Sequence, residues 1–156
     1  MPSHDIPALL AAHPILAEFD PSALAELAGC ARLDNWPAGA TIFREGEAAD
    51  ALWLIRRGEV ALEIAAPGRA PLVVETLRAG DVLGWSWLVP PHRFMADARA
   101  LSDAGGLRLD AVCLRRKCDA QPAIGYRLFK AWLPHLTERM RAQRLQMLDL
   151  YGSDAG

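Results

Sequence analysis

The chain has 156 residues, a length that suits one domain with a single hydrophobic core. Hydrophobic residues make up 52% of the sequence and charged residues 23%, which is typical of a globular protein and excludes a disordered one. The formal net charge of −2 excludes the strong basic excess that marks a free-standing nucleic-acid-binding domain.

The sequence shows no segment typical of a membrane-spanning helix or a signal peptide. No apolar run approaches the roughly 20 residues that a membrane-spanning helix needs. The segment Met1–Asp5 lacks basic residues ahead of an apolar stretch, so we expect no signal peptide and a cytoplasmic protein.

Three cysteines are too few, and odd in number, for a disulfide framework, so Cys30, Cys113 and Cys118 are expected to be reduced. A redox role for Cys113 and Cys118, which flank a basic run, is the alternative.

Residues 1–32 are predicted to form short helices. Asp20 is a good N-cap, and Pro21 suits the first helical position. Apolar residues at Leu24 and Leu27 follow at helical spacing, and Gly29 is expected to end the helix.

Residues 33–109 have a sequence pattern that is typical of β-sheet proteins. Short segments of β-branched and apolar residues alternate with turn residues every 8 to 12 positions. This pattern predicts a β-sandwich or β-barrel. The predicted strands are residues 41–44, 51–55, 59–64, 71–77, 95–101 and 106–109.

Residues 110–151 return to helical spacing. A short helix is predicted near residues 110–118, and Pro122 opens a long one that Pro134 should kink or split. The long helix carries an apolar stripe at Ile124, Leu128, Trp132, Leu136 and Met140. A stripe of this length needs a partner, so we expect it to be a dimerisation helix; folding back on its own barrel is the alternative.

Five glycines fall at predicted strand ends, where a tight turn or a positive φ is needed. They are Gly39, Gly46, Gly58, Gly80 and Gly84. Their order, with Pro37-Ala38-Gly39 and Glu45-Gly46-Glu47, resembles the cyclic-nucleotide-binding domain of Crp/Fnr-type regulators. The resemblance implies a mainly β fold, a cyclic-nucleotide-binding β-barrel of double-stranded β-helix or jelly-roll type. Short N-terminal helices and a long C-terminal helix would flank it, all within one domain over 1–156.

The resemblance also implies where a ligand would bind. The family holds a cyclic phosphate with a short helix and loop, here residues 84–96, with a glutamate after the glycine and with a later arginine. Trp85 stands at the glutamate position and Phe94 at the arginine position, with Arg93 one residue early. Loss of both polar contacts would weaken binding by about 10² to 10⁴. We therefore do not expect tight binding of cyclic AMP or cyclic GMP.

Three interpretations of this segment stay open. Arg93 and Ser86 could still hold a phosphate, or Trp85 and Trp87 could stack on the flat ring of another ligand. In the third interpretation the side chains close the pocket and the domain is a scaffold. The candidate ligand-binding residues are Gly84, Trp85, Ser86, Trp87, Arg93, Phe94 and Met95. The four histidines are scattered, so we expect no metal site.

These features predict a regulatory module without a resident cofactor. Its ligand would be a nucleotide or another small anion, and it would signal to a protein partner. The alternative is a ligand-independent interaction subunit of a protein complex. An enzyme ranks last because no nucleophile–base–acid set is visible. Too few residues follow Gly152 for a helix-turn-helix of about 20 residues, so we expect no direct DNA binding.

Overall fold

The computed structural model describes residues 5–153. Residues 1–4, part of the segment on which the expected absence of a signal peptide rests, lie outside this range. Three short helices come first: α1 (Ile6–Ala12), the 3₁₀ helix η1 (Pro14–Leu16) and α2 (Pro21–Ala28). The carboxylate of Asp20 accepts a hydrogen bond from the α2 backbone over 2.8 Å, which confirms the predicted cap.

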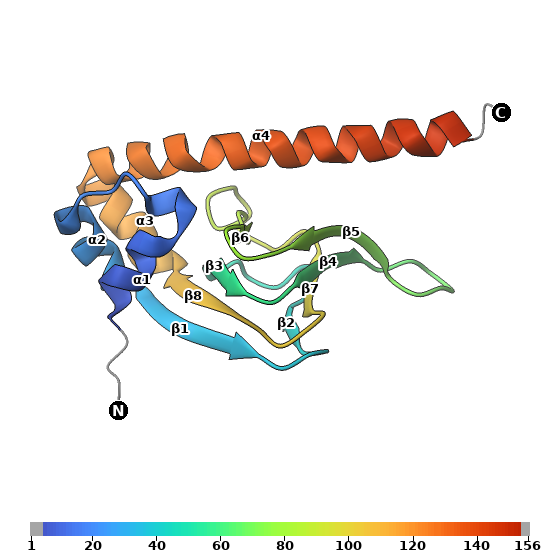
Figure 1. Ribbon diagram of the computed structural model, residues 1–156, viewed down its shortest axis with the longest axis horizontal. Helices are drawn as coiled ribbons and strands as arrows, with labels where there is room; N and C mark the ends of the chain where they lie inside the picture. The colour runs from blue at the N-terminus through green and yellow to red at the C-terminus, as the bar shows by residue number, and fades with distance from the viewer. Residues whose placement is uncertain (1–4, 154–156) are drawn as a thin grey trace.

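The strands form two four-stranded antiparallel sheets, which confirms the predicted mainly β fold with flanking helices (Figure 1). One sheet has the order β1-β8-β3-β6 and the other the order β2-β7-β4-β5. The strands are β1 (Ala31–Trp36), β2 (Thr41–Phe43), β3 (Ala51–Arg57), β4 (Val60–Ile64), β5 (Leu72–Leu77), β6 (Val82–Leu83), β7 (Asp97–Ala100) and β8 (Ala104–Asp110).

Strands β1 and β6 were not predicted. β1 contains Asp34 and Asn35, which have low strand propensity, and it forms because it pairs with β8 along its whole length. β6 has only two residues, paired with Trp53 and Leu54. In both cases the partner strand, rather than local propensity, makes the strand.

The core has two parts that meet on β3. Trp53 and Ile55 point into the barrel, while Leu52 and Leu54 pack against the helices on the other face. Because β3 is covered on both faces, its residues 51–55 are all buried, which explains the unbroken apolar run in the sequence.

The C-terminal helices are α3 (Ala111–Ala120) and α4 (Pro122–Ser153). Helix α4 runs along the top of the molecule above β6 and β5 in Figure 1. Of the two effects predicted for Pro134, the split is wrong, since α4 is one continuous helix, and the kink stays a prediction. Pro134 lacks the backbone N–H that would donate to the Lys130 carbonyl. Thr137 Oγ1 separately donates to the carbonyl of Leu133, four residues earlier, over 2.9 Å.

The structure also corrects the expectation of three reduced cysteines. Cys30, at the start of β1, forms a disulfide with Cys113 of α3. No sequence pattern indicates this pair, because 83 positions separate the two residues and only the fold brings them together. Cys118 is a free thiol, and burial raises its pKa, so it is not a reactive thiolate. Because disulfides are rare in cytosolic proteins, cytoplasmic localisation stays a prediction.

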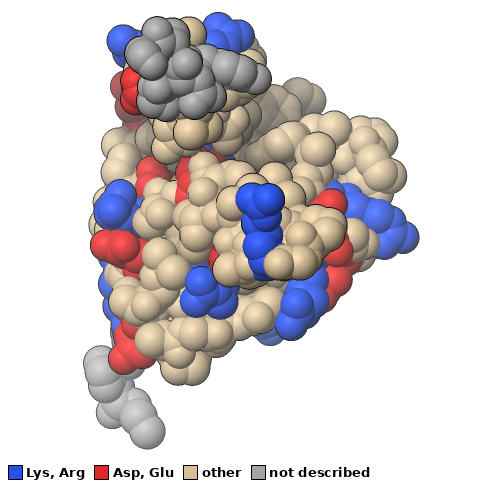
Figure 2. Space-filling view, turned by 90° about the vertical axis from the view of Figure 1, so that its right-hand side faces the viewer, with Lys and Arg blue, Asp and Glu red and all other residues tan. Residues whose placement is uncertain are grey.

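The surface carries charges of both signs. On the face shown in Figure 2, lysine and arginine are interspersed with aspartate and glutamate over a largely uncharged surface. No helix among residues 5–153 has the length and hydropathy to cross a membrane.

The disulfide generates a first prediction. Replacing Cys113 by serine should lower the free energy of unfolding by about 2–4 kcal/mol, because the unfolded chain regains the entropy of a long loop. Urea unfolding under non-reducing conditions measures this, with Cys118→Ser as the matched control that should change little. Equal stability of Cys113→Ser and the parent protein would show that the disulfide does not stabilise the fold.

Candidate ligand-binding site

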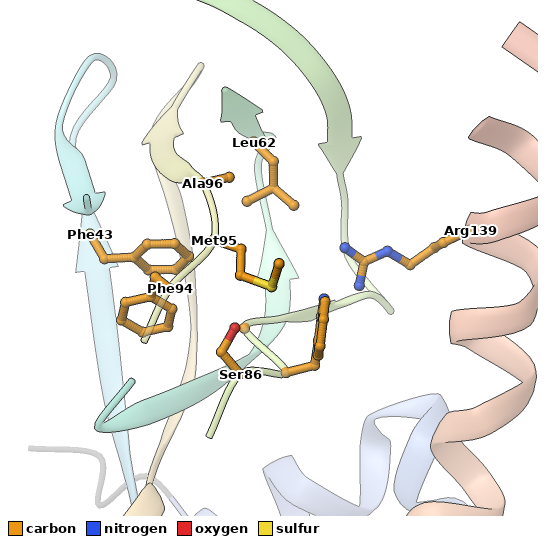
Figure 3. Close-up of a pocket in the computed structure, with 9 residues that line it drawn as sticks. Phe43, Leu62, Ser86, Phe94, Met95, Ala96 and Arg139 are labelled. Atoms are coloured by element: carbon orange, nitrogen blue, oxygen red, sulfur yellow. The ribbon is translucent and has the colours of Figure 1, made fainter. Parts of the chain in front are cut away.

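A small cavity opens between the barrel, the loop of residues 84–96 and helix α4 (Figure 3). Its volume is about 50 Å³. It is lined by Phe43, Leu62, Gly84, Trp85, Ser86, Phe94, Met95, Ala96 and Arg139. Five of the seven predicted ligand-binding residues are therefore brought together, and four lining residues were not predicted: Phe43, Leu62, Ala96 and Arg139.

The barrel side of the cavity is an aromatic wall. Phe94 is buried and stacks on Phe43 of β2, with ring centroids 3.7 Å apart. Gly84 has φ +85°, and a Cβ there would lie 3.3 Å from the Phe94 ring. The position at which the family resemblance places an arginine is thus part of the hydrophobic core, and it offers an anion no charge.

Two of the predicted residues lie elsewhere. Arg93 is exposed, and its Nη1 donates to the Gly46 carbonyl over 2.7 Å, so the interpretation in which Arg93 reaches the pocket is wrong for this structure. Trp87 is fully buried and stacks on Trp132 of α4, with centroids 6.0 Å apart. Trp87 is therefore a core residue and not a ligand platform; Trp85 alone of the two lines the cavity.

The loop itself offers hydrogen-bond donors to the cavity. Ser86 lines the cavity, is only 5% exposed, and its hydroxyl has no hydrogen-bond partner within residues 5–153. The backbone N–H groups of Trp85, Ser86 and Trp87 likewise donate to no acceptor in that part of the chain. Several donors at one turn form an environment that favours an anion or a hydrogen-bond acceptor.

Among the nine residues that line the cavity, Arg139 is the one with a positively charged side chain. It extends from α4 toward the loop, as Figure 3 shows. Its guanidinium forms a bidentate ion pair with Glu75 of β5, with Nη2 2.7 Å from the carboxylate. Arg139 was not predicted as a site residue, because Arg139, Arg141 and Arg144 together resemble a solvated helix face. No local signal marks it, since its partner Glu75 lies 64 positions away in the chain.

The predicted apolar stripe of α4 is only partly free. Ile124, Leu128 and Trp132 are buried in the chain's own core, so they are not available to a second copy, and that part of the dimerisation prediction is wrong. Leu136 packs partly on the same core, whereas Met140 is 55% exposed.

An exposed face of α4 shares Leu136 and Met140 with the predicted stripe. Apolar residues alternate at spacings of three and four: Tyr126, Phe129, Leu133, Leu136, Met140 and Met147, with Gln143 at the intervening place. We call this set the α4 seam. Spacings of three and four are typical of a coiled-coil face. An apolar groove of about 420 Å³ adjoins it, between the loop at Trp85, Leu88 and Val89 and the helix.

The chain matches the family model of the cyclic nucleotide-binding domain over residues 33–121, and it belongs to that family. It is 30% identical over 133 residues to the HTH-type transcriptional regulator Cmr of Mycobacterium tuberculosis, covering 85% of this chain and 51% of that protein. It is 26% identical over 146 residues to the CRP-like cAMP-activated global transcriptional regulator of the same species, covering 94% and 63%. The chain thus spans half to two thirds of these curated relatives.

Solved structures show the same fold. A cyclic nucleotide-binding domain from Methylobacillus flagellatus has a TM-score of 0.77 at 20% identity, covering 92% of this chain and 81% of that one. The N-terminal domain of a transcriptional regulator from Streptomyces coelicolor has a TM-score of 0.67 at 24% identity, covering 86% and 94%. The curated relatives are transcriptional regulators. The fold predicted from the glycine pattern is confirmed.

The aromatic wall generates the second prediction. Phe94→Ala should lower the free energy of unfolding by about 3–5 kcal/mol, because it leaves a cavity beside Phe43. Met95→Ala, one residue on and 65% exposed, should cost less than about 0.5 kcal/mol. Chemical denaturation of both variants measures the difference. A small effect at Phe94 would mean that the residue is free to leave the core and admit a ligand.

Proposed function

We propose that this chain is a regulatory module that senses a small anionic ligand other than cyclic AMP or cyclic GMP and passes the signal to a protein partner through α4. The observation that carries the proposal is the composition of the cavity wall. One cavity is bordered by the ligand loop of the family and by Arg139 of the long helix. A ligand there touches both elements, so its binding energy can favour one position of α4 over another.

The size and chemistry of the cavity argue against an ordinary cyclic nucleotide. Ligand pockets for drug-sized molecules have volumes of about 300–1,000 Å³, and this one has about 50 Å³. Trp85 and Phe94 replace the two polar contacts that the family resemblance implies. The Ser86 hydroxyl and the loop amides have no hydrogen-bond partner among residues 5–153. They favour a compact hydrogen-bond acceptor over a nucleoside as the ligand.

Two contacts connect the loop to the helices. Arg115 of α3 donates to the Trp87 carbonyl over 2.6 Å, and Trp87 stacks on Trp132 of α4. Lys117 of α3 in turn pairs with Glu26 of α2 over 2.7 Å. A shift of the loop would therefore move α3 and α4 together, which supports these helices as the output of the sensor.

We also propose that the protein is a homodimer and that the α4 seam is its contact. Large exposed apolar side chains in a row are costly in water and mark interaction surfaces. The seam adjoins the apolar groove beside the ligand loop, so a second copy would lie close to the sensing site.

A ligand-independent interaction subunit is the second candidate. The stack of Phe94 on Phe43 and the small volume of the cavity favour it, since they leave little room for a ligand. The two candidates differ in one respect that can be measured, namely whether any small anion binds.

The third prediction concerns ligands. Cyclic AMP and cyclic GMP should give no saturation in calorimetry up to about 1 mM, because two polar contacts worth about 1–3 kcal/mol each are absent. Cyclic dinucleotides and small organic phosphates complete the panel, and thermal unfolding of each sample confirms that the protein is folded. Saturation by cyclic AMP at micromolar concentration would contradict the proposal. Failure of every anion in the panel would favour the interaction subunit.

The fourth prediction concerns the seam. Leu133→Glu should convert a dimer into a monomer, because it places a charge without a partner in an apolar contact. Light scattering coupled to size-exclusion chromatography measures the mass. Ala142→Glu adds the same charge off the seam and should leave the dimer intact. A monomeric parent protein, or a dimeric Leu133→Glu variant, would refute the assignment.

A further inference from the structure

His13 lies at the junction between the N-terminal helices and the barrel. It follows α1 directly, precedes η1 and is only 4% exposed. A buried polar side chain needs hydrogen-bond partners, because it has given up its contacts with water. Both ring nitrogens of His13 have such a partner, and the two partners belong to different parts of the fold.

The two hydrogen bonds require the neutral imidazole. Nδ1 accepts from the backbone N–H of Ile15 over 3.3 Å and so caps η1. Because Nδ1 accepts, the ring proton is on Nε2, which donates to the Asp81 carbonyl over 3.3 Å. One ring therefore joins η1 to the turn before β6. The imidazolium has two donors and no acceptor, so it cannot keep the bond to Ile15.

The surroundings of His13 also favour the neutral ring. Burial lowers the pKa of His13, and the hydrogen bond to the Asp81 carbonyl opposes this less strongly. The charge of a protonated His135 on α4 lowers the pKa further, whereas the Asp81 carboxylate raises it. Arg56 of β3 lines the same groove as His13 and is a further cation there.

The helix η1 packs in turn against the base of α4. Ile15 and Leu16 of η1 are buried in one core cluster with Ile124, Leu128 and Trp132. In Figure 1 the N-terminal helices lie beside the first part of α4. Since η1 has only three residues, loss of its cap affects the whole turn and reaches the contacts that hold α4.

We propose that His13 is an acid-sensitive latch: protonation of Nδ1 breaks the bond to Ile15, frees η1 to open and loosens the base of α4. The latch goes beyond the proposed function, because it operates whichever ligand the cavity binds, and also when the cavity binds none.

The direction of the pH dependence follows from the lowered pKa. Where η1 is open, His13 takes up its proton as the pH falls below about 6.5, the ordinary value for imidazole. Where η1 is closed, the proton is taken up only at lower pH. The stability that the latch contributes is therefore complete above this pH and is lost below it.

Amide hydrogen exchange followed by mass spectrometry tests the latch. One pH unit below the ordinary imidazole pKa, the open form gains at most about 10-fold. Between pH 7.5 and pH 5.5, after correction for the intrinsic rate, protection of residues 14–19 and 124–132 should thus fall between about 3- and 10-fold.

Two variants make the test specific. In His13→Asn the side-chain carbonyl can still cap Ile15 but takes up no proton, so protection should be equal at the two pH values. His92→Asn removes an imidazole from the loop of residues 84–96, at a φ of +59° that asparagine tolerates. This control should keep the pH dependence of the parent protein.

Three outcomes would overturn the inference. An equal loss of protection in the parent protein and in His13→Asn would assign the pH dependence to another group. A loss at residues 14–19 without one at 124–132 would remove the connection to α4. Should His13→Asn not fold, nitrogen NMR of the parent protein must place the ring proton of His13 on Nε2 at pH 7.5. A proton on Nδ1, or a titration midpoint at or above about 6.5, would contradict the latch.

Discussion

The ion pair between Arg139 and Glu75 determines how the long helix relates to the barrel. The first half of α4 is held by Ile124, Leu128 and Trp132 in the core. Beyond them the helix carries mostly exposed side chains, and Arg139 anchors it to β5. That anchor places a guanidinium in the wall of the cavity beside the ligand loop. The pair thus attaches the outer part of α4 to the barrel and lines the cavity.

This pair contributes direction to the attachment of α4 more than stability. Two charges that are mostly removed from water lose hydration, and their mutual attraction repays that loss only in part. The bidentate geometry makes the contact directional, so it specifies one position of the helix. The contact of Trp132 with Trp87 holds the base of the helix independently of this pair.

The fold could be predicted from the sequence because its signals are local. Gly58 and Gly84 adopt positive φ at strand ends, Asp20 caps α2, and Pro122 begins α4. The site could be predicted only in part. The loop at Gly84, Trp85 and Ser86 follows the order of the family, but Arg139 and the Cys30–Cys113 disulfide join residues far apart in the chain. The α4 seam could have been predicted, because its apolar residues recur in the sequence at spacings of three and four. The stripe at Ile124, Leu128 and Trp132, which the fold buries, was predicted as the contact instead.

A double-mutant cycle on Glu75 and Arg139 tests the central claim most directly. The free energy of unfolding is measured for the parent protein, Glu75→Gln, Arg139→Gln and the double variant. Our account predicts that each single variant is destabilised because it leaves a partly buried charge unpaired, and that the double variant loses less than the sum. The coupling should be at least about 1 kcal/mol. Additivity within about 0.5 kcal/mol would show that the two side chains do not hold α4 to the barrel, and it would contradict the account.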